Sequence, residues 1–198
     1  MYETKDSESN ATKYATTVER KSERELVVTR TFNGPAHIVF DAWTKPELIQ
    51  RWWVPKSFGA SFLSCEANAR TGGNYRFVFS HASSEQRMSF FGRYVEVTPH
   101  SRLVWTNDEG EEGGAVTTVT FEERGGKTVV VWHDLYASKE ALDEAMASGA
   151  TSGFSEQFDR NSEQFDNYSE HFFGSTGRFD TGSGVGLPGC FQHNDSCR

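Results

Sequence analysis

The stretch PAHIVFDAWTKPELIQRWW, residues 35–53, decides how the chain folds. It predicts two short helices that meet at Pro46, because Pro35 suits the first turn of one helix and Pro46 suits that of the next. Thr44 is expected to cap the second helix. Apolar residues recur at three- and four-residue spacing, so each helix has one face to bury. Three of the five tryptophans lie here, and we expect the pair to cover a sheet.

Segments of alternating or β-branched residues on both sides of this pair predict an antiparallel sheet. One strand precedes the pair, and six follow it with tight turns between them. The Gly-Gly pair at residues 125–126 is typical of a hairpin turn. Gly92, inside a long strand, is expected to mark a bulge or a bend. The predicted strands are Glu25–Phe32, Ser61–Ala67, Asn74–Ser80, Met88–Thr98, Arg102–Asn107, Val116–Arg124 and Lys127–Leu135, with a polar loop at residues 81–86.

Two helices are predicted after the sheet: Lys139–Ser148, capped by Ser138, and a longer one from about Thr151 to Phe173. The long helix carries aromatic residues at helical spacings, so it is expected to lie across the concave face of a curved sheet. This order predicts an α+β fold, with about seven strands around a long C-terminal helix. Composition predicts a disordered tail at residues 1–22, one domain at 23–173 and a flexible Gly/Ser-rich tail at 174–198.

The chain has 198 residues and a formal net charge of −8. No basic stripe offsets this charge, which argues against nucleic acid or an anionic membrane as a partner. No apolar run approaches the roughly 20 residues of a membrane helix, and residues 1–22 lack the apolar core of a signal peptide. Three cysteines do not make a disulfide framework. We therefore expect a cytoplasmic protein, and the choice between monomer and homodimer stays open.

Motifs for metal, nucleotide and covalent chemistry are incomplete. Cys190, His193 and Cys197 offer three soft ligands, but no fourth lies near them in sequence, and structural zinc sites use four. Residues 184–189 match the glycine pattern of dinucleotide-binding loops without the strand and helix that must flank it. No Gly-x-Ser-x-Gly elbow is present for a serine nucleophile. We expect no metal, no cofactor and no catalytic residue.

The patterns around the other reactive side chains indicate structural or solvent-exposed roles and not catalytic ones. His133 and Asp134 are adjacent on one predicted strand and therefore face opposite sides of the sheet, which excludes a local acid–base pair. We expect His133 at a margin of the sheet. Cys65 has no adjacent histidine to lower its pKa. The acidic run at residues 108–112 matches no calcium loop and is typical of a solvated hairpin tip.

The aromatic side chains are the one group of residues in this sequence that points to a binding site. Tyr75, Phe77 and Phe79 alternate along one strand and share one of its faces. Such rings form either ordinary core or the wall of a mostly apolar ligand pocket, and the sequence leaves both open. The candidate pocket residues are Trp43, Trp53, Tyr75, Phe77, Phe79, Phe91, Trp105, Trp132, Phe154 and Phe158, with Arg76, Arg93 and Glu96 as candidate polar groups.

Several blocks of the sequence resemble the Hsp90 ATPase-activator-homologue family, a branch of the START-like (SRPBCC) superfamily. They are VFDAWT at 39–44 with Pro46-Glu47 and Arg51-Trp52-Trp53, GRYVEV at 92–97 with Pro99 and RLVWT at 102–106, and Gly153-Phe154. The resemblance spans about residues 24–160. It implies a helix-grip fold with a cavity between sheet and long helix that suits an apolar ligand.

The end of the chain departs from this family, whose members usually continue the last helix with leucines. Asn161 stands where a leucine is expected, and the pentapeptide SEQFD occurs twice, at 155–159 and 162–166. A local duplication or a shifted reading frame would account for the repeat. A buried asparagine predicts poor packing of this helix.

Three functions stay open at this point. The first, which we favour, is non-catalytic binding or sequestration of a small apolar molecule, since aromatics abound and nucleophiles, metal sets and paired carboxylates do not. The second, implied by the family, is a co-chaperone module that stimulates a chaperone ATPase, with a role in the stress response. The third is a polyketide cyclase-like enzyme, which would need a polar group of strongly shifted pKa inside the cavity.

Overall fold

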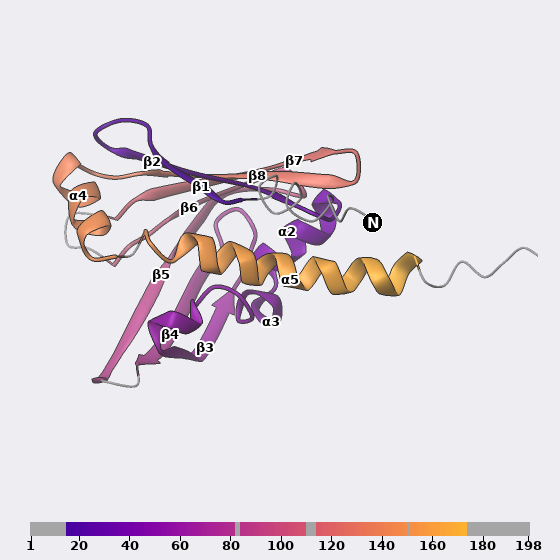
Figure 1. Ribbon diagram of the computed structural model, residues 1–198. Helices are drawn as coiled ribbons and strands as arrows, with labels where there is room; N and C mark the ends of the chain where they lie inside the picture. Colours follow the sequence, from indigo (N-terminus) through magenta and orange to yellow (C-terminus); the bar gives the residue numbers. More distant parts are fainter. Residues whose placement is uncertain (1–14, 82–83, 110–113, 150, 174–198) are drawn as a thin grey trace, which may run out of the picture.

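The computed structural model describes residues 15–81, 84–109, 114–149 and 151–173. Its centre is an eight-stranded antiparallel sheet in the order β1-β2-β8-β7-β6-β5-β4-β3 (Figure 1). Among the described residues, no helix combines the length and apolar composition that a membrane crossing requires. The elements are β1 Thr17–Arg20, β2 Glu25–Phe32, α2 Ala36–Thr44, α3 Pro46–Ile49, the 3-10 helix η1 Lys56–Phe58, β3 Ala60–Ala67, β4 Asn74–His81, β5 Ser84–Thr98, β6 Arg102–Thr106, β7 Val116–Arg124, β8 Lys127–Leu135, α4 Lys139–Ala147 and α5 Phe154–Phe173.

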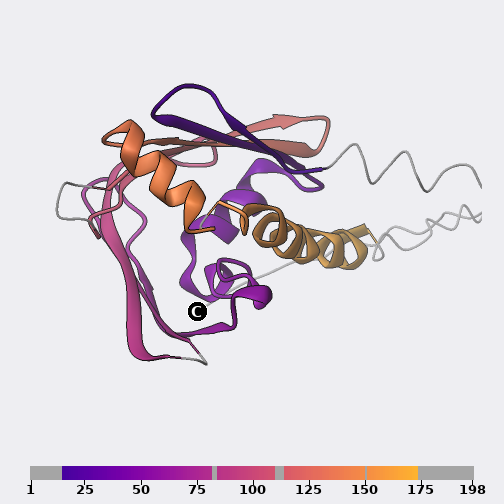
Figure 2. The same ribbon diagram turned by 60° about the vertical axis from the view of Figure 1, so that its left-hand side comes forward.

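The sheet is strongly bent, and helix α5 lies inside the bend (Figure 2). The long strand β5 makes the corner, because its first part pairs with β4 and its last part pairs with β6. Phe154, Phe158 and Phe165 of α5 are all buried, at 7%, 0% and 3% exposure. The predicted helix-grip arrangement, with a phenylalanine-bearing helix across the concave face, is therefore confirmed.

The irregularity predicted at Gly92 lies three residues further along β5. The register between β5 and β6 shifts between Tyr94 and Glu96, which leaves Val95 bulged and 54% exposed. Gly92 has a different role. A Cβ atom built there would lie 1.8 Å from the carbonyl oxygen of Thr106, so the absence of a side chain allows the two strands to approach.

The helix pair forms as predicted, but Thr44 does not cap its second helix. Lys45 occupies that N-cap position, and Pro46 begins α3. The Thr44 hydroxyl instead donates to the carbonyl oxygen of Phe40, at 2.9 Å, within α2. The predicted cap of α4 is confirmed, because the Ser138 side chain accepts from the backbone N–H of Ala141.

Two segments expected to lack regular structure contain strands. Thr17–Arg20, placed by composition in a disordered tail, forms β1 and pairs with β2. The polar loop expected at residues 81–86 is mostly strand, because β4 extends to His81 and β5 starts at Ser84. The tail expected at 174–198, with its cysteine–histidine and glycine motifs, lies outside the described residues, as do residues 1–14.

Candidate ligand-binding site

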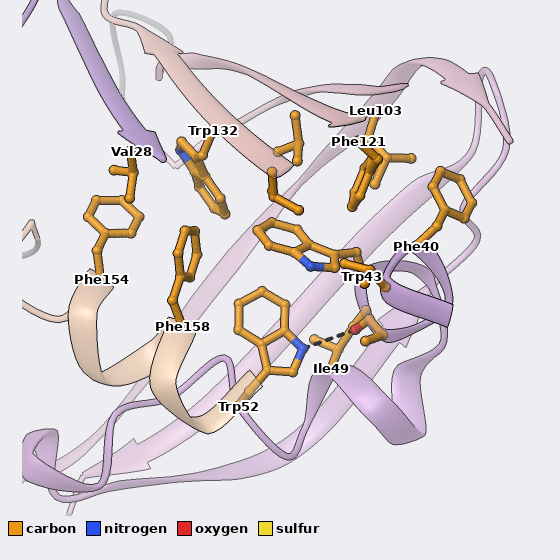
Figure 3. Close-up of a cluster of buried hydrophobic side chains, with 14 of the residues drawn as sticks. Val28, Phe40, Trp43, Ile49, Trp52, Leu103, Phe121, Trp132, Phe154 and Phe158 are labelled. Atoms are coloured by element: carbon orange, nitrogen blue, oxygen red, sulfur yellow. Dashed lines mark hydrogen bonds between the residues drawn. The ribbon is translucent and has the colours of Figure 1, made fainter. Parts of the chain in front are cut away.

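All five tryptophans of the chain meet in one cluster beneath the sheet. Figure 3 shows three of them, Trp43, Trp52 and Trp132, beside Phe154 and Phe158 of α5. The ring centroids of Trp43 and Trp52 lie 4.6 Å apart, and those of Trp52 and Trp53 lie 5.3 Å apart. Trp132, on β8, joins the cluster from the sheet and lies 5.2 Å from Trp105. Residues near in sequence supply one wall of this cluster, and distant strands supply the other.

A small hollow lies beside this cluster. The space open to the centre of a water-sized sphere is about 10 Å³, which is about the room that one water molecule needs. Pockets for drug-sized ligands are far larger, on the order of 300–1,000 Å³. The side chains that line the hollow are aromatic with one exception, and they are Trp43, Ile49, Trp53, Tyr75, Phe77, Tyr94 and Trp105.

A chain of hydrogen bonds starts at the wall of the hollow and crosses the sheet; it is partly buried at Asn107 and fully buried between Thr117 and Asp134. The Tyr75 hydroxyl donates to Asn107 Oδ1 (2.9 Å), and Asn107 Nδ2 donates to Thr117 Oγ1 (3.0 Å). Thr117 in turn donates to Asp134 Oδ1 at 2.5 Å. Burial raises the pKa of Asp134 to about 6, against the opposing effects of Thr117 and Trp132. The chain therefore ends on a buried acid whose pKa lies above its ordinary value.

Two indole N–H groups in the cluster have no hydrogen-bond partner among the described residues. They belong to Trp43 and Trp132, which are 3% and 8% exposed. Trp52, packed against Trp43, differs because its N–H donates to the carbonyl oxygen of Ala42 at 3.0 Å. Buried donors are nearly always satisfied. The Trp132 indole acts on the Asp134 carboxylate, whose pKa it lowers, so the indole N–H of Trp43 is the exception that needs an explanation.

Polar side chains of α5 hold the segment that carries Trp53. Glu156 accepts from the backbone N–H groups of Lys56 (2.6 Å) and Ser57 (3.2 Å) and from the Ser57 hydroxyl. Gln157 donates to the carbonyl oxygen of Trp53. Arg160 donates to that of Val54. This wall of the hollow is therefore attached to the helix through hydrogen bonds near the surface.

Residues 33–165 match the family described as Activator of Hsp90 ATPase homolog 1-like protein. The chain belongs to this family. No curated protein matches it. A Rhodobacter sphaeroides crystal structure is 20% identical, with a TM-score of 0.69 over 77% of this chain and 98% of that one. A Nitrosomonas europaea protein is also 20% identical (TM-score 0.67, 76% and 99% covered). The AHSA1-like protein of Aeromonas hydrophila, solved by NMR, is 16% identical (0.56, 72% and 94%).

These structures share the fold of the family. The resemblance placed a cavity between the sheet and the long helix, whereas the hollow is lined by the sheet and by the segment of residues 43–53, with no lining residue from α5. Of the ten candidate pocket residues, five line the hollow: Trp43, Trp53, Tyr75, Phe77 and Trp105. Four more belong to the surrounding buried core, namely Phe79, Trp132, Phe154 and Phe158. Ile49 and Tyr94 line the hollow and were not among the candidates. Gly92 pairs with Tyr75, so it lies on the buried face of the sheet. Side chains alternate along a strand, so Tyr94, two residues after Gly92, faces the same side.

Phe91 was expected in the pocket, but it lies on the opposite face of the sheet. It pairs with Arg76 on β4 and is 36% exposed, with the guanidinium 5.9 Å from its ring centre. The candidate polar groups Arg76 and Arg93 are likewise exposed. Glu96 forms an ion pair with Arg102, at 3.2 Å, away from the hollow. Successive side chains of a strand point to opposite faces, so the neighbours of the buried residues point away from the concave face.

Three further predictions concern single residues. His133 lies on the face opposite to its buried neighbours and contacts Glu25 at 3.1 Å, so it takes no part in the hollow. Burial, together with Glu47 and Glu66, raises the pKa of Cys65 to about 12, which keeps it a thiol. Asn161 is fully buried, and its Nδ2 has no partner among the described residues. Sequence reasoning missed Asp134 as a buried acid because burial depends on strand phase.

Proposed function

We propose that the domain binds a small, largely apolar molecule in the hollow between the sheet and the helix pair. The observation that carries this proposal is the hollow itself, which six aromatic side chains and Ile49 line. A core built only for stability gains from filling such a space, because each missing contact costs packing energy.

The hollow must widen to admit a molecule larger than water. Trp53 is the lining residue that we expect to move, because it is only partly buried and its backbone is attached to α5 through polar contacts, although its ring also packs on Trp52, Phe77 and Trp132. Trp43, in contrast, is packed on Trp52, Phe121, Trp132 and Phe158. Binding therefore couples to a displacement of the segment between α3 and β3.

Native mass spectrometry of gently purified protein tests the proposal, together with titration of an apolar fluorescent probe. We expect a retained small molecule or saturable probe binding that displaces it. Ile49→Phe fills the hollow and should abolish probe binding. Leu142→Phe, at a buried position outside the hollow, is the matched control for overpacking and should leave binding intact. Absence of both retained ligand and probe binding in the wild type would contradict the proposal.

A second candidate, a co-chaperone module, is favoured by the family description alone. Its test is the ATPase rate of Hsp90 with and without this protein. Catalysis is less well supported. The ionisable groups that line the hollow are the phenols of Tyr75 and Tyr94, and burial raises the pKa of both. Asp134, the acid of strongly raised pKa, is separated from the hollow by Thr117 and Asn107.

A further inference from the structure

We propose that the ligand of the hollow carries an uncharged hydrogen-bond acceptor, such as a ketone or ether oxygen, that receives the indole N–H of Trp43. This inference rests on the proposed function and narrows its ligand class. Trp43 lines the hollow, is 3% exposed, and its Nε1 has no partner among the described residues. An aromatic wall with one unused donor favours an apolar molecule with one acceptor.

The local packing explains why this donor stays unpaired. The nearby carbonyl oxygen of Ala42 already receives the N–H of Trp52. In Figure 3 the nitrogen of Trp43 lies on the ring edge turned toward Ile49, another residue of the hollow. Ile49 and the aromatic carbons around it offer no strong acceptor. The indole N–H of Trp43 can therefore be paired only by an acceptor that comes from outside the protein.

Electrostatics favour an uncharged acceptor over a carboxylate or a phosphate. None of the seven lining side chains carries a positive charge. Burial raises the pKa of the Tyr75 phenol, and the neighbouring carboxylates of Glu109, Asp108 and Asp134 raise it further. The same carboxylates would oppose a second negative charge at the hollow. An anionic ligand would also lose its hydration without gaining a cationic partner.

Three probes of similar size separate these possibilities: acetophenone, with a ketone oxygen; ethylbenzene, without an acceptor; and benzoate, with a charged one. We expect acetophenone to bind about three- to tenfold more tightly than ethylbenzene, the usual effect of one satisfied hydrogen bond, and benzoate to bind more weakly than both. In ¹⁵N-labelled protein, acetophenone should shift the Trp43 indole N–H signal, and ethylbenzene should leave its hydrogen-bond state unchanged.

Two variants locate the donor. Trp43→Phe keeps an aromatic ring but removes the N–H, so ethylbenzene should then bind at least as tightly as acetophenone. Trp132→Phe is the matched control, because Trp132 is also a buried tryptophan of the cluster but does not line the hollow. It should keep the preference for the ketone. If Trp43→Phe does not fold, the wild-type indole signals still decide the question.

The outcomes distinguish this inference from the proposed function. Equal binding of ethylbenzene and acetophenone, or tighter binding of benzoate, overturns the inference and leaves the proposed function in place. The inference is also overturned if Trp132→Phe loses the preference for acetophenone and Trp43→Phe keeps it. If none of the three probes binds and the apolar fluorescent probe also fails, both proposals fall together. A ketone preference that depends on Trp43 supports both.

Discussion

The hydroxyl of Thr117 donates a 2.5 Å hydrogen bond to the carboxylate of Asp134, its directly opposite neighbour in the β7–β8 pair. Both residues face the buried side of the sheet, where Thr117 is 1% and Asp134 is 5% exposed. Among the described residues, no side-chain cation forms an ion pair with this acid. Asp134 is therefore buried with hydrogen bonds in place of a counter-charge.

This environment predicts that ionisation of Asp134 destabilises the fold. Its pKa rises from 3.8 to about 6 on folding, so the native state holds more protons than the unfolded state between these values, and stability falls as pH rises through them. Asp134→Asn should match the wild type near pH 4 and exceed its stability above pH 6. The gain should reach up to about 3 kcal/mol, at about 1.4 kcal/mol per pKa unit.

Urea unfolding at a series of pH values measures this effect. Glu66→Gln, an exposed carboxylate on β3, is the control and should show no comparable gain. A constant difference between Asp134→Asn and the wild type from pH 4 to pH 8 would mean that Asp134 is not the titrating group.

Asn161→Leu should stabilise the protein. Asn161 is 0% exposed, its Oδ1 accepts from Gln164 at 3.3 Å, and its Nδ2 donates to no described residue. Leucine removes an unsatisfied buried donor and adds apolar contact beneath α5, so we expect a gain of about 1 to 2 kcal/mol. Ser155→Leu, exposed on the same helix, controls for helix propensity. Chemical denaturation compares the two, and a loss of stability in Asn161→Leu would refute the argument.

Glu156→Gln should loosen the segment that carries Trp53. Hydrogen bonds from the Ser57 hydroxyl and the backbone N–H groups of Ser57 and Lys56 hold the pKa of Glu156 below its ordinary value. Such a carboxylate stabilises the fold above its ordinary pKa, and this contribution disappears as pH falls through the lowered value. We expect Tm to drop by roughly 1 to 3 °C at pH 7, with no difference at strongly acidic pH. Calorimetry at both pH values is the measurement.

Gly92→Ala should disrupt the pairing of β5 with β6. Its Cβ would lie 1.8 Å from the carbonyl oxygen of Thr106, a backbone atom that cannot move aside without breaking the ladder. We expect a loss of at least about 2 kcal/mol. Gly34→Ala is the matched control, since its Cβ would meet Phe165 at an ordinary 3.7 Å. Similar unfolding curves for the two variants would show that the sheet adapts to the added methyl group.

Much of the fold follows from patterns that are local in sequence. The hairpin of β7 and β8 has its predicted bounds, because Gly125 and Gly126 both adopt positive φ and the strands alternate on either side. The buried face of β4 was likewise readable from Tyr75, Phe77 and Phe79. Phe91 was placed on the wrong face because the sequence does not fix the register of β5 against β4, where Phe91 pairs with the exposed Arg76.

The sequence by itself determined the order of strands and α-helices from residue 25 onward, the helix pair at residues 35–53 and the aromatic character of the concave face, because turns and periodicity act between residues a few positions apart. Only the tertiary structure decided the size of the hollow, the burial of Asp134 and which of two neighbouring tryptophans keeps an unpaired N–H. Those features depend on the register of strands that meet across the sheet and on a few ångströms of packing, which no local pattern encodes.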